Sequence, residues 1–135
     1  MIDMPAGGLG HFLGKLPFAS RGDLGLDRRK VTQCALSRIC GVCGESLSRP
    51  VAFLGSTEEA GRNAFHFPPT HLACAELAVA TWGSDNGVLG QGHPPASWAL
   101  VTTSGFEYVR PEAEWVDRRA VFEPNSVIEE RALTP

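Results

Sequence analysis

The sequence has no long apolar run, and none approaches the roughly eighteen consecutive apolar residues that a membrane-spanning helix needs. Residues 1–8 carry an acid where a secretory signal has basic residues, and no long apolar core follows them. The sequence therefore predicts a cytoplasmic protein with no membrane contact. In the reducing cytoplasm, paired cysteines are more often metal ligands than disulfides.

The sequence also lacks a strong charge of either sign. Its net charge is −3, and residues 1–49 form a locally basic segment with seven Lys or Arg against four Asp or Glu. A protein dedicated to DNA binding carries a stronger positive field than this. A glycine-rich phosphate loop, a nucleophile elbow and a paired-carboxylate signature are missing as well. The sequence therefore gives no evidence for the enzyme classes that these three motifs identify.

What remains is the composition of one small globular domain. The chain has 135 residues, of which 43% are hydrophobic and 20% are charged. Its 15 Gly and 10 Pro predict many turns and few long elements. A small core interrupted by turns is the setting in which a bound metal contributes most to folding.

Two short motifs supply such a metal site. Cys40 and Cys43 are separated by two residues, and so are His71 and Cys74. A lone Cys-x-x-Cys is compatible with a redox pair or with unrelated buried thiols, but the second pair favours zinc. Three thiolates and one imidazole fill the four positions of a structural zinc site, whereas a catalytic zinc keeps one position open. The His-x-Glu and Pro-Cys-x-x-Cys signature of zinc deaminases is absent.

The elements expected around these ligands follow the order of a treble-clef zinc module. Asp27 fits an N-cap before the first helix, and Thr70 can cap the second. His71 and Cys74 are three residues apart, so they project from the same side of the first turn of that second helix. The expected segments are a helix over residues 28–38, a hairpin of strands 50–54 and 64–67 around a polar turn at 55–62, and a helix over 71–82.

We expect an α+β protein in three parts. These are an extended glycine-rich arm at residues 1–26, a treble-clef-like zinc core at 27–83, and a β-hairpin with a C-terminal extension at 84–135. The arm would dock through its apolar residues Phe12, Leu13 and Phe18. The third part is expected to contain strands at 98–103 and 106–109 joined by a turn, a strand at 120–122 and a helical piece at 125–133.

From Asp27 to about Trp82 the chain resembles an uncharacterised family of small zinc-binding proteins from actinobacteria and their phages. The matching residues are Asp27, Lys30, Cys40, Val42, Cys43, Gly44, Ala52, Phe53, Gly55, Arg62, Pro68, Pro69, His71, Cys74 and Ala75, and residues 100–103 resemble a later strand of that family. The resemblance supports the ligand set and implies no activity. Gly41 stands where the family has tryptophan, and two further cysteines typical of the family have no counterpart here.

Three further residues are candidates for a site. Cys34 is either a fifth candidate ligand or, as we favour, a buried thiol. His66 is either the catalytic histidine of a His-metal-finger nuclease or, as we favour, an exposed strand histidine. His93 lies in a loop rich in Gly and Pro, where a solvated turn is the favoured reading.

The leading hypothesis is a non-enzymatic binding or adaptor protein with one structural zinc ion. Its partner would be another protein or, less favoured, nucleic acid bound through the basic residues Arg28, Arg29, Lys30 and Arg38. A solvated helix face is the favoured reading of this basic cluster. The alternatives are a phage-type nuclease that uses His66, and a small zinc-containing enzyme with its site near His66 or His93.

Overall fold

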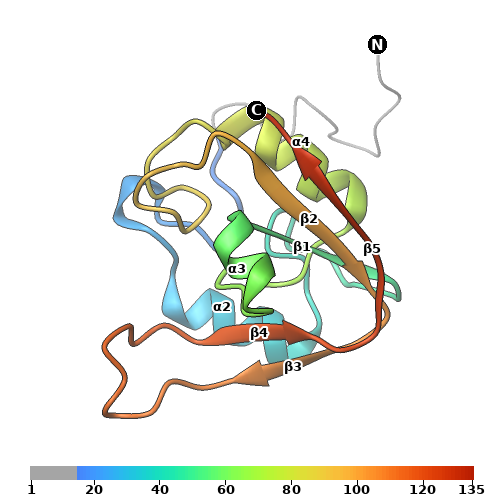
Figure 1. Ribbon diagram of the computed structural model, residues 1–135. Helices are drawn as coiled ribbons and strands as arrows, with labels where there is room; N and C mark the ends of the chain where they lie inside the picture. Colours follow the sequence, from blue (N-terminus) through green and yellow to red (C-terminus); the bar gives the residue numbers. More distant parts are fainter. Residues whose placement is uncertain (1–14) are drawn as a thin grey trace.

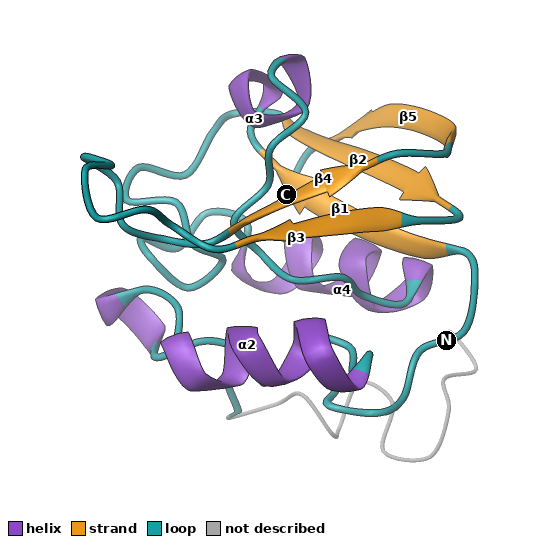
Figure 2. Ribbon diagram, turned by 90° about the horizontal axis from the view of Figure 1, so that it is seen from below, coloured by secondary structure: helices purple, strands orange, loops and turns teal. Residues whose placement is uncertain are grey.

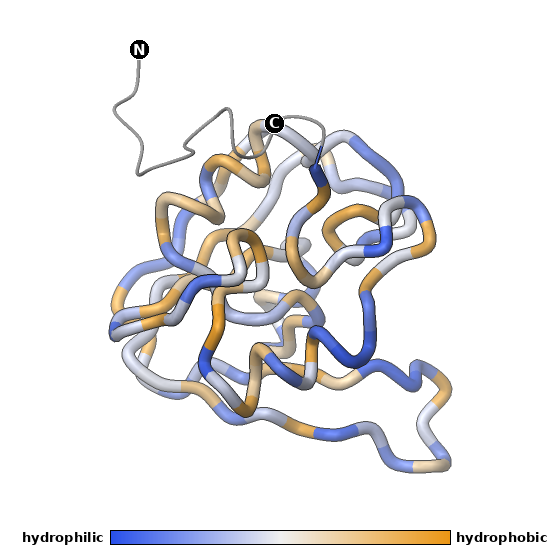
Figure 3. Tube along the Cα trace, turned by 180° about the vertical axis from the view of Figure 1, so that it is seen from behind, coloured by the Kyte–Doolittle hydropathy of each residue, from blue (hydrophilic) through white to orange (hydrophobic). Residues whose placement is uncertain are grey.

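The computed structural model describes residues 15–135 and shows an α+β fold with two small antiparallel sheets (Figure 1). The expected fold class is thereby confirmed. The helices are η1 (Gly22–Leu24, a 3-10 turn), α2 (Arg28–Ser37), α3 (Thr57–Gly61) and α4 (Leu72–Trp82). The strands are β1 (Val51–Gly55), β2 (Trp98–Thr103), β3 (Phe106–Val109), β4 (Val121–Pro124) and β5 (Val127–Leu133). Short hydrophobic and hydrophilic stretches alternate along the chain (Figure 3). No helix in residues 15–135 is long and apolar enough to cross a membrane.

Helix α2 begins where the sequence predicts. The Asp27 side chain accepts a hydrogen bond from the Lys30 backbone N–H at 3.1 Å, which satisfies one of the unpaired donors of the first turn. The helix ends at Arg38, whose left-handed backbone (φ 53°) turns the chain toward the first ligand pair. Val31 and Cys34, three residues apart, form its buried face.

The first sheet has the strand order β1-β2-β5, and β1 and β2 are buried at every position. Both faces of these two strands are covered, because successive side chains point to opposite sides. Ala52 and Leu54 pack in one core with α4, which lies along one face of the sheet in Figure 2. Val51 and Phe53 belong to a second core on the other face.

The second core joins the first sheet to the two-stranded sheet of β3 and β4. The Phe122 ring centroid lies 5.8 Å from that of Phe53 and 5.9 Å from that of Phe106. Phe65 donates a backbone hydrogen bond to Phe122 at 2.9 Å and accepts one from it at 2.7 Å. Aromatic rings at these separations contribute beyond the area they bury. The β3-β4 ribbon is therefore anchored at Phe122.

The first expected hairpin is not formed. β1 pairs with β2, and residues 64–67 contain only an isolated bridge from Phe65 to Phe122. The expected polar turn holds helix α3, which starts with a capping box in which Ser56 and Glu59 each accept a backbone hydrogen bond from the other. This capped helix turns the chain away from β1. The knuckle and the ligand helix of the treble clef are present, and the treble-clef arrangement itself stays a prediction.

The second expected hairpin is also not formed, although both of its strands exist. β2 has β1 on one edge and β5 on the other, so β3 pairs with β4 instead. The strand expected at 120–122 is confirmed as β4, but the helical piece expected at 125–133 is wrong, because residues 127–133 form β5. Antiparallel pairing along β2, with Leu133 opposite Trp98, satisfies the backbone of β5 and overrides its helical propensity.

The described part of the expected arm, residues 15–26, lies against the knuckle. Phe18 and Ala19 donate backbone hydrogen bonds to the carbonyls of Val42 and Gly41 at 2.9 and 3.0 Å. Asp27 in turn donates to the Ala19 carbonyl at 2.7 Å. The other expected docking residues of the arm lie outside the described residues: Phe12 and Leu13. The boundaries expected after residues 26 and 83 stay predictions.

Candidate functional site

The fold brings the four predicted ligands together. Cys40 and Cys43 lie on the turn between α2 and β1, His71 is the N-cap of α4, and Cys74 lies in the first turn of that helix. The three sulfur atoms and one imidazole nitrogen all lie within 4.8 Å of one another. Among residues 15–135 they form the only group of three or more His, Cys, Asp or Glu side chains arranged to hold a metal ion.

The spacing of these atoms fits a tetrahedral zinc site. With zinc bonds of about 2.3 Å to sulfur and about 2.0 Å to nitrogen, tetrahedral angles place the two atoms about 3.5 Å apart. His71 Nδ1 lies 3.4 Å from Cys43 Sγ and 3.7 Å from Cys74 Sγ. These two distances match a tetrahedral site, and three thiolates with one imidazole are a donor set that suits zinc.

The imidazole of His71 is oriented for this role. Its Nε2 lies 3.0 Å from the Ser46 carbonyl oxygen, and a carbonyl can only accept. Nε2 therefore carries the hydrogen and donates, which leaves the lone pair on Nδ1, the nitrogen that faces the sulfur atoms. Metal-binding histidines are commonly oriented by a carbonyl acceptor in this way.

Gly41 allows the two ligand pairs to approach each other. Its backbone N–H donates to the Pro69 carbonyl at 2.8 Å, which ties the knuckle to the segment leading into His71. A Cβ atom on Gly41 would lie 2.7 Å from Pro68 Cγ and 2.9 Å from Phe67 Cε2. Both distances are shorter than a carbon contact allows, so a larger residue would push the knuckle away from this segment.

The three clustered thiols favour a bound cation. Hydrogen bonds from Cys43 and Cys74 hold the pKa of Cys40 well below its usual range. The hydrogen bonds of Cys74 with Cys40 and Cys43, together with burial, raise the pKa of Cys74. The backbone N–H groups of Val42 and Cys43 also point at Cys40 Sγ, at 3.3 and 3.4 Å. Three thiolates this close together repel one another unless a cation lies between them. A zinc ion supplies the positive charge that allows all three sulfurs to be thiolates at once.

Cys34 is a buried thiol and not a fifth ligand. Its side chain is 0% exposed, and burial raises its pKa to about 12, with the charges of Cys40 and Cys43 as lesser causes. It lies outside the metal-holding group. The structure therefore confirms the alternative that we favoured for this residue.

Comparisons with protein-family models, curated proteins and solved structures give no match for this chain. The interpretation of the site therefore depends on its own geometry. Membership of the actinobacterial and phage family, with the resemblance described above, stays a prediction.

His66 is buried rather than exposed, so the favoured reading of an exposed strand histidine is wrong. Its side chain is 6% exposed, and Nδ1 lies 3.0 Å from the Ala120 carbonyl, to which it donates. Nε2 lies 3.4 Å from the Asp117 carboxylate and 4.0 Å from that of Glu59. Hydrogen bonds from Arg119 to Asp117 hold the pKa of that carboxyl well below its usual range.

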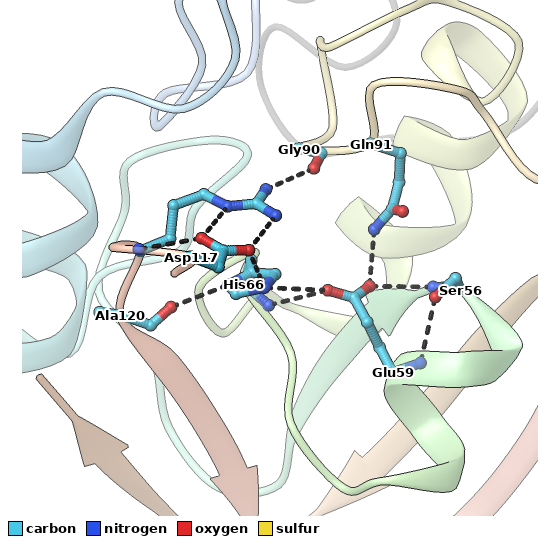
Figure 4. Close-up of polar contacts among 8 residues, drawn as sticks. Ser56, Glu59, His66, Gly90, Gln91, Asp117 and Ala120 are labelled. Atoms are coloured by element: carbon cyan, nitrogen blue, oxygen red, sulfur yellow. Dashed lines mark hydrogen bonds and ion pairs between the residues drawn. The ribbon is translucent and has the colours of Figure 1, made fainter. Parts of the chain in front are cut away.

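Glu59 connects this histidine to two other segments (Figure 4). Its Oε1 accepts hydrogen bonds from the Ser56 backbone at 3.0 Å and from the Gln91 side chain at 2.6 Å. Its Oε2 accepts from the His66 backbone N–H at 3.3 Å. One buried carboxylate thus joins the start of α3, the loop before β2 and the segment that follows α3.

The sequence reasoning missed this buried polar cluster. One local signal was present, because Ser56 and Glu59 have the spacing of a capping box. The contacts of His66 with Asp117 and Ala120 join residues far apart in the chain, and no local pattern marks them.

Two of the four basic residues at and after the start of α2 lie over aromatic rings. Lys30 Nζ lies 5.2 Å from the ring centre of Phe18, and the Arg38 guanidinium lies 5.3 Å from the ring centre of Phe106. Both side chains therefore make cation–π contacts within the protein. Arg28 instead lines a cleft beside His66. His93, the remaining candidate, lies exposed in its loop.

Proposed function

We propose that this protein is a non-enzymatic binding or adaptor protein whose fold is held by one structural zinc ion at Cys40, Cys43, His71 and Cys74. The observation that carries the proposal is that four protein side chains supply donor atoms within 4.8 Å of one another. A zinc ion held by four protein ligands has no open position for a reacting water molecule. Its role is then to join elements of the fold.

The proposed zinc ion would connect three parts of a small core. The knuckle carries two ligands, the N-cap and first turn of α4 carry the other two, and residues 18–19 are hydrogen-bonded to the knuckle carbonyls. The unfolded chain has no preformed site, so the free energy of metal binding becomes part of the free energy of folding. A core broken by many turns benefits most from such a link.

The test is the metal content of protein purified without added zinc, combined with matched serine variants. We expect about one zinc per chain, tetrahedral thiolate absorption after cobalt substitution, and loss of both in Cys74→Ser. Cys34→Ser, which alters a buried thiol outside the ligand group, is the control and should keep the metal. Protein without metal, with Cys40 and Cys43 joined in a disulfide, would instead identify a redox protein.

A small-molecule site beside His66 is the second candidate function. The observation that favours it is a solvent-open cleft of about 810 Å³ that His66 lines. The nuclease alternative receives less support, because both ring nitrogens of His66 already face protein groups, the Ala120 carbonyl and the Asp117 carboxylate. A nuclease would show magnesium-dependent nicking that His66→Ala abolishes.

A partner protein is the interaction expected of an adaptor, and we retain it as a proposal. A structural zinc site leaves the protein surface as the functional part of the molecule. We also propose, from the sequence, that the protein comes from an actinobacterium or a phage and that it is located in the cytoplasm.

A further inference from the structure

Three segments far apart in the sequence enclose the cleft beside His66. They are residues 23–32, which include the start of α2, the loop residues 87–92, and residues 108–120, which run from the end of β3 to the start of β4. Figure 1 shows all three on the same side of the molecule. The cleft has a volume of about 810 Å³. Sites for small molecules and cofactors are commonly of this size.

Four arginines line this cleft in a protein whose net charge is −3: Arg28, Arg110, Arg118 and Arg119. The first three are exposed, and within residues 15–135 none of them has an ion-pair or hydrogen-bond partner for its guanidinium group. Asp23 is the one acid among the lining residues. The cleft is therefore locally cationic, and its free guanidinium groups match the geometry of phosphate oxygens.

The fourth arginine fixes the wall of the cleft. Arg119 donates to Asp117 through Nε at 3.0 Å and Nη2 at 2.8 Å, and through Nη1 to the Gly90 carbonyl at 2.8 Å. Asp117 also contacts His66, whose ring donates to Ala120, as Figure 4 shows. These bonds hold the loop that carries Arg110 and Arg118 against residue 90. A site held in place before binding loses less free energy to ordering.

The rest of the lining is apolar or aromatic. Leu24 is 74% exposed at the cleft, and Leu26, Val31 and Tyr108 lie beside the arginines. The Tyr108 hydroxyl lies 3.3 Å from Thr32 Oγ1, which connects β3 to α2 across the cleft. A ligand that suits this lining has an anionic end for the guanidinium groups and a flat, weakly polar body for the leucines and the tyrosine.

We propose that this cleft, with Arg28, Arg110 and Arg118 at its edge, binds a nucleoside phosphate. This deepens the binding function proposed above by naming a ligand class, and it uses none of the zinc ligands. A small ligand is favoured over a nucleic-acid chain because Lys30 and Arg38 are occupied by aromatic rings and do not extend the basic surface. The negative net charge also opposes attraction of a polyanion.

The zinc knuckle and the cleft share one supporting segment. The Val42 and Gly41 carbonyls hold Phe18 and Ala19, and the Ala19 carbonyl accepts from Asp27 at the start of α2. The chain between these points forms the wall at residues 23–26. Binding must therefore be measured on the zinc-loaded full chain, with zinc content determined on the same samples.

The experiment is calorimetric titration with the four ribonucleoside diphosphates, with the matching nucleosides and inorganic phosphate as partial ligands. We expect saturable binding of one molecule of at least one diphosphate per chain, with each partial ligand at least tenfold weaker. Arg110→Ala and Arg118→Ala should each weaken binding by about tenfold, the usual effect of removing a charge-assisted hydrogen bond. Both side chains are exposed and unpaired within residues 15–135, so both variants should fold and keep their zinc.

The matched control is the pair Arg28→Ala and Arg29→Ala. Both arginines are exposed in the first turn of α2, but only Arg28 lines the cleft, so only Arg28→Ala should weaken binding. The proposal is overturned if no diphosphate binds at concentrations up to about 1 mM, roughly the weak limit of specific binding. It is also overturned if Arg28→Ala and Arg29→Ala change the affinity by the same amount. Tighter binding of a single-stranded oligonucleotide than of any nucleotide would also overturn it. If zinc-loaded protein binds none of these ligands, the cleft proposal is wrong and the zinc proposal is unaffected. If metal-free protein binds a diphosphate, the zinc proposal is wrong and the cleft proposal is unaffected.

Discussion

Replacing Glu59 by alanine is expected to lower the free energy of unfolding by about 3 kcal/mol, because three donors lose one buried acceptor. Glu59 is 3% exposed and accepts from the Ser56 backbone, the Gln91 side chain and the His66 backbone. The His66 N–H is buried and would be left unpaired, at a cost of about 2 kcal/mol, and loss of the capping box adds about 1 kcal/mol. Water can replace the acceptor for Ser56 and Gln91, which are only half-buried.

Urea unfolding of zinc-loaded protein, with zinc held at one concentration, measures this difference. Glu59→Gln keeps the shape and one acceptor oxygen but turns an amide N–H₂ toward a donor, so about half the loss is expected. The control is Glu58→Ala, an exposed glutamate in the same turn of α3. If Glu59→Ala and Glu58→Ala differ by less than about 0.5 kcal/mol, within the range of ordinary surface substitutions, the polar cluster does not hold these segments together.

The remaining predictions concern the knuckle and the buried thiol. Cys34 should resist alkylation at pH 8 in the zinc-loaded protein, because a thiol with a pKa of about 12 is almost never a thiolate at that pH and this side chain has no exposed surface. Mass spectrometry should find Cys34 modified only after the protein is unfolded. Rapid labelling of the native protein would refute its burial. Gly41→Ala should lower stability by about 2 kcal/mol through its contacts with Pro68 and Phe67, whereas Gly92→Ala, with nothing within 4 Å of the added atom, should not. Equal thermal shifts in these two glycine variants would contradict the close packing of the knuckle.

Local sequence patterns were enough to predict the metal-holding group and the starts of two helices. The two ligand pairs have a two-residue spacing that places each pair on one short turn, so the metal-holding group followed without knowledge of the fold. The start of α2 at Asp27 and the ligand helix α4 also followed from local patterns of capping and apolar periodicity. Thr70, expected as the second cap, instead donates its hydroxyl to the Ala52 carbonyl, and His71 takes the N-cap position.

The pairing of the strands and the contacts of His66 depend on how the whole chain packs. The apolar runs at β1 and β2 predict strands, but the runs themselves do not specify which strand each one pairs with, because any strand that helps to bury their side chains is a possible neighbour. The second edge of β2 is filled by residues whose own propensity allows a helix, so β5 exists because of its partner. The cleft arises in the same way, since its arginines, its glycine-rich loop and His66 come from separate segments. Local hydrogen bonds and backbone preferences act over a few residues and can be read from the sequence, whereas these contacts depend on which segments the whole core brings together.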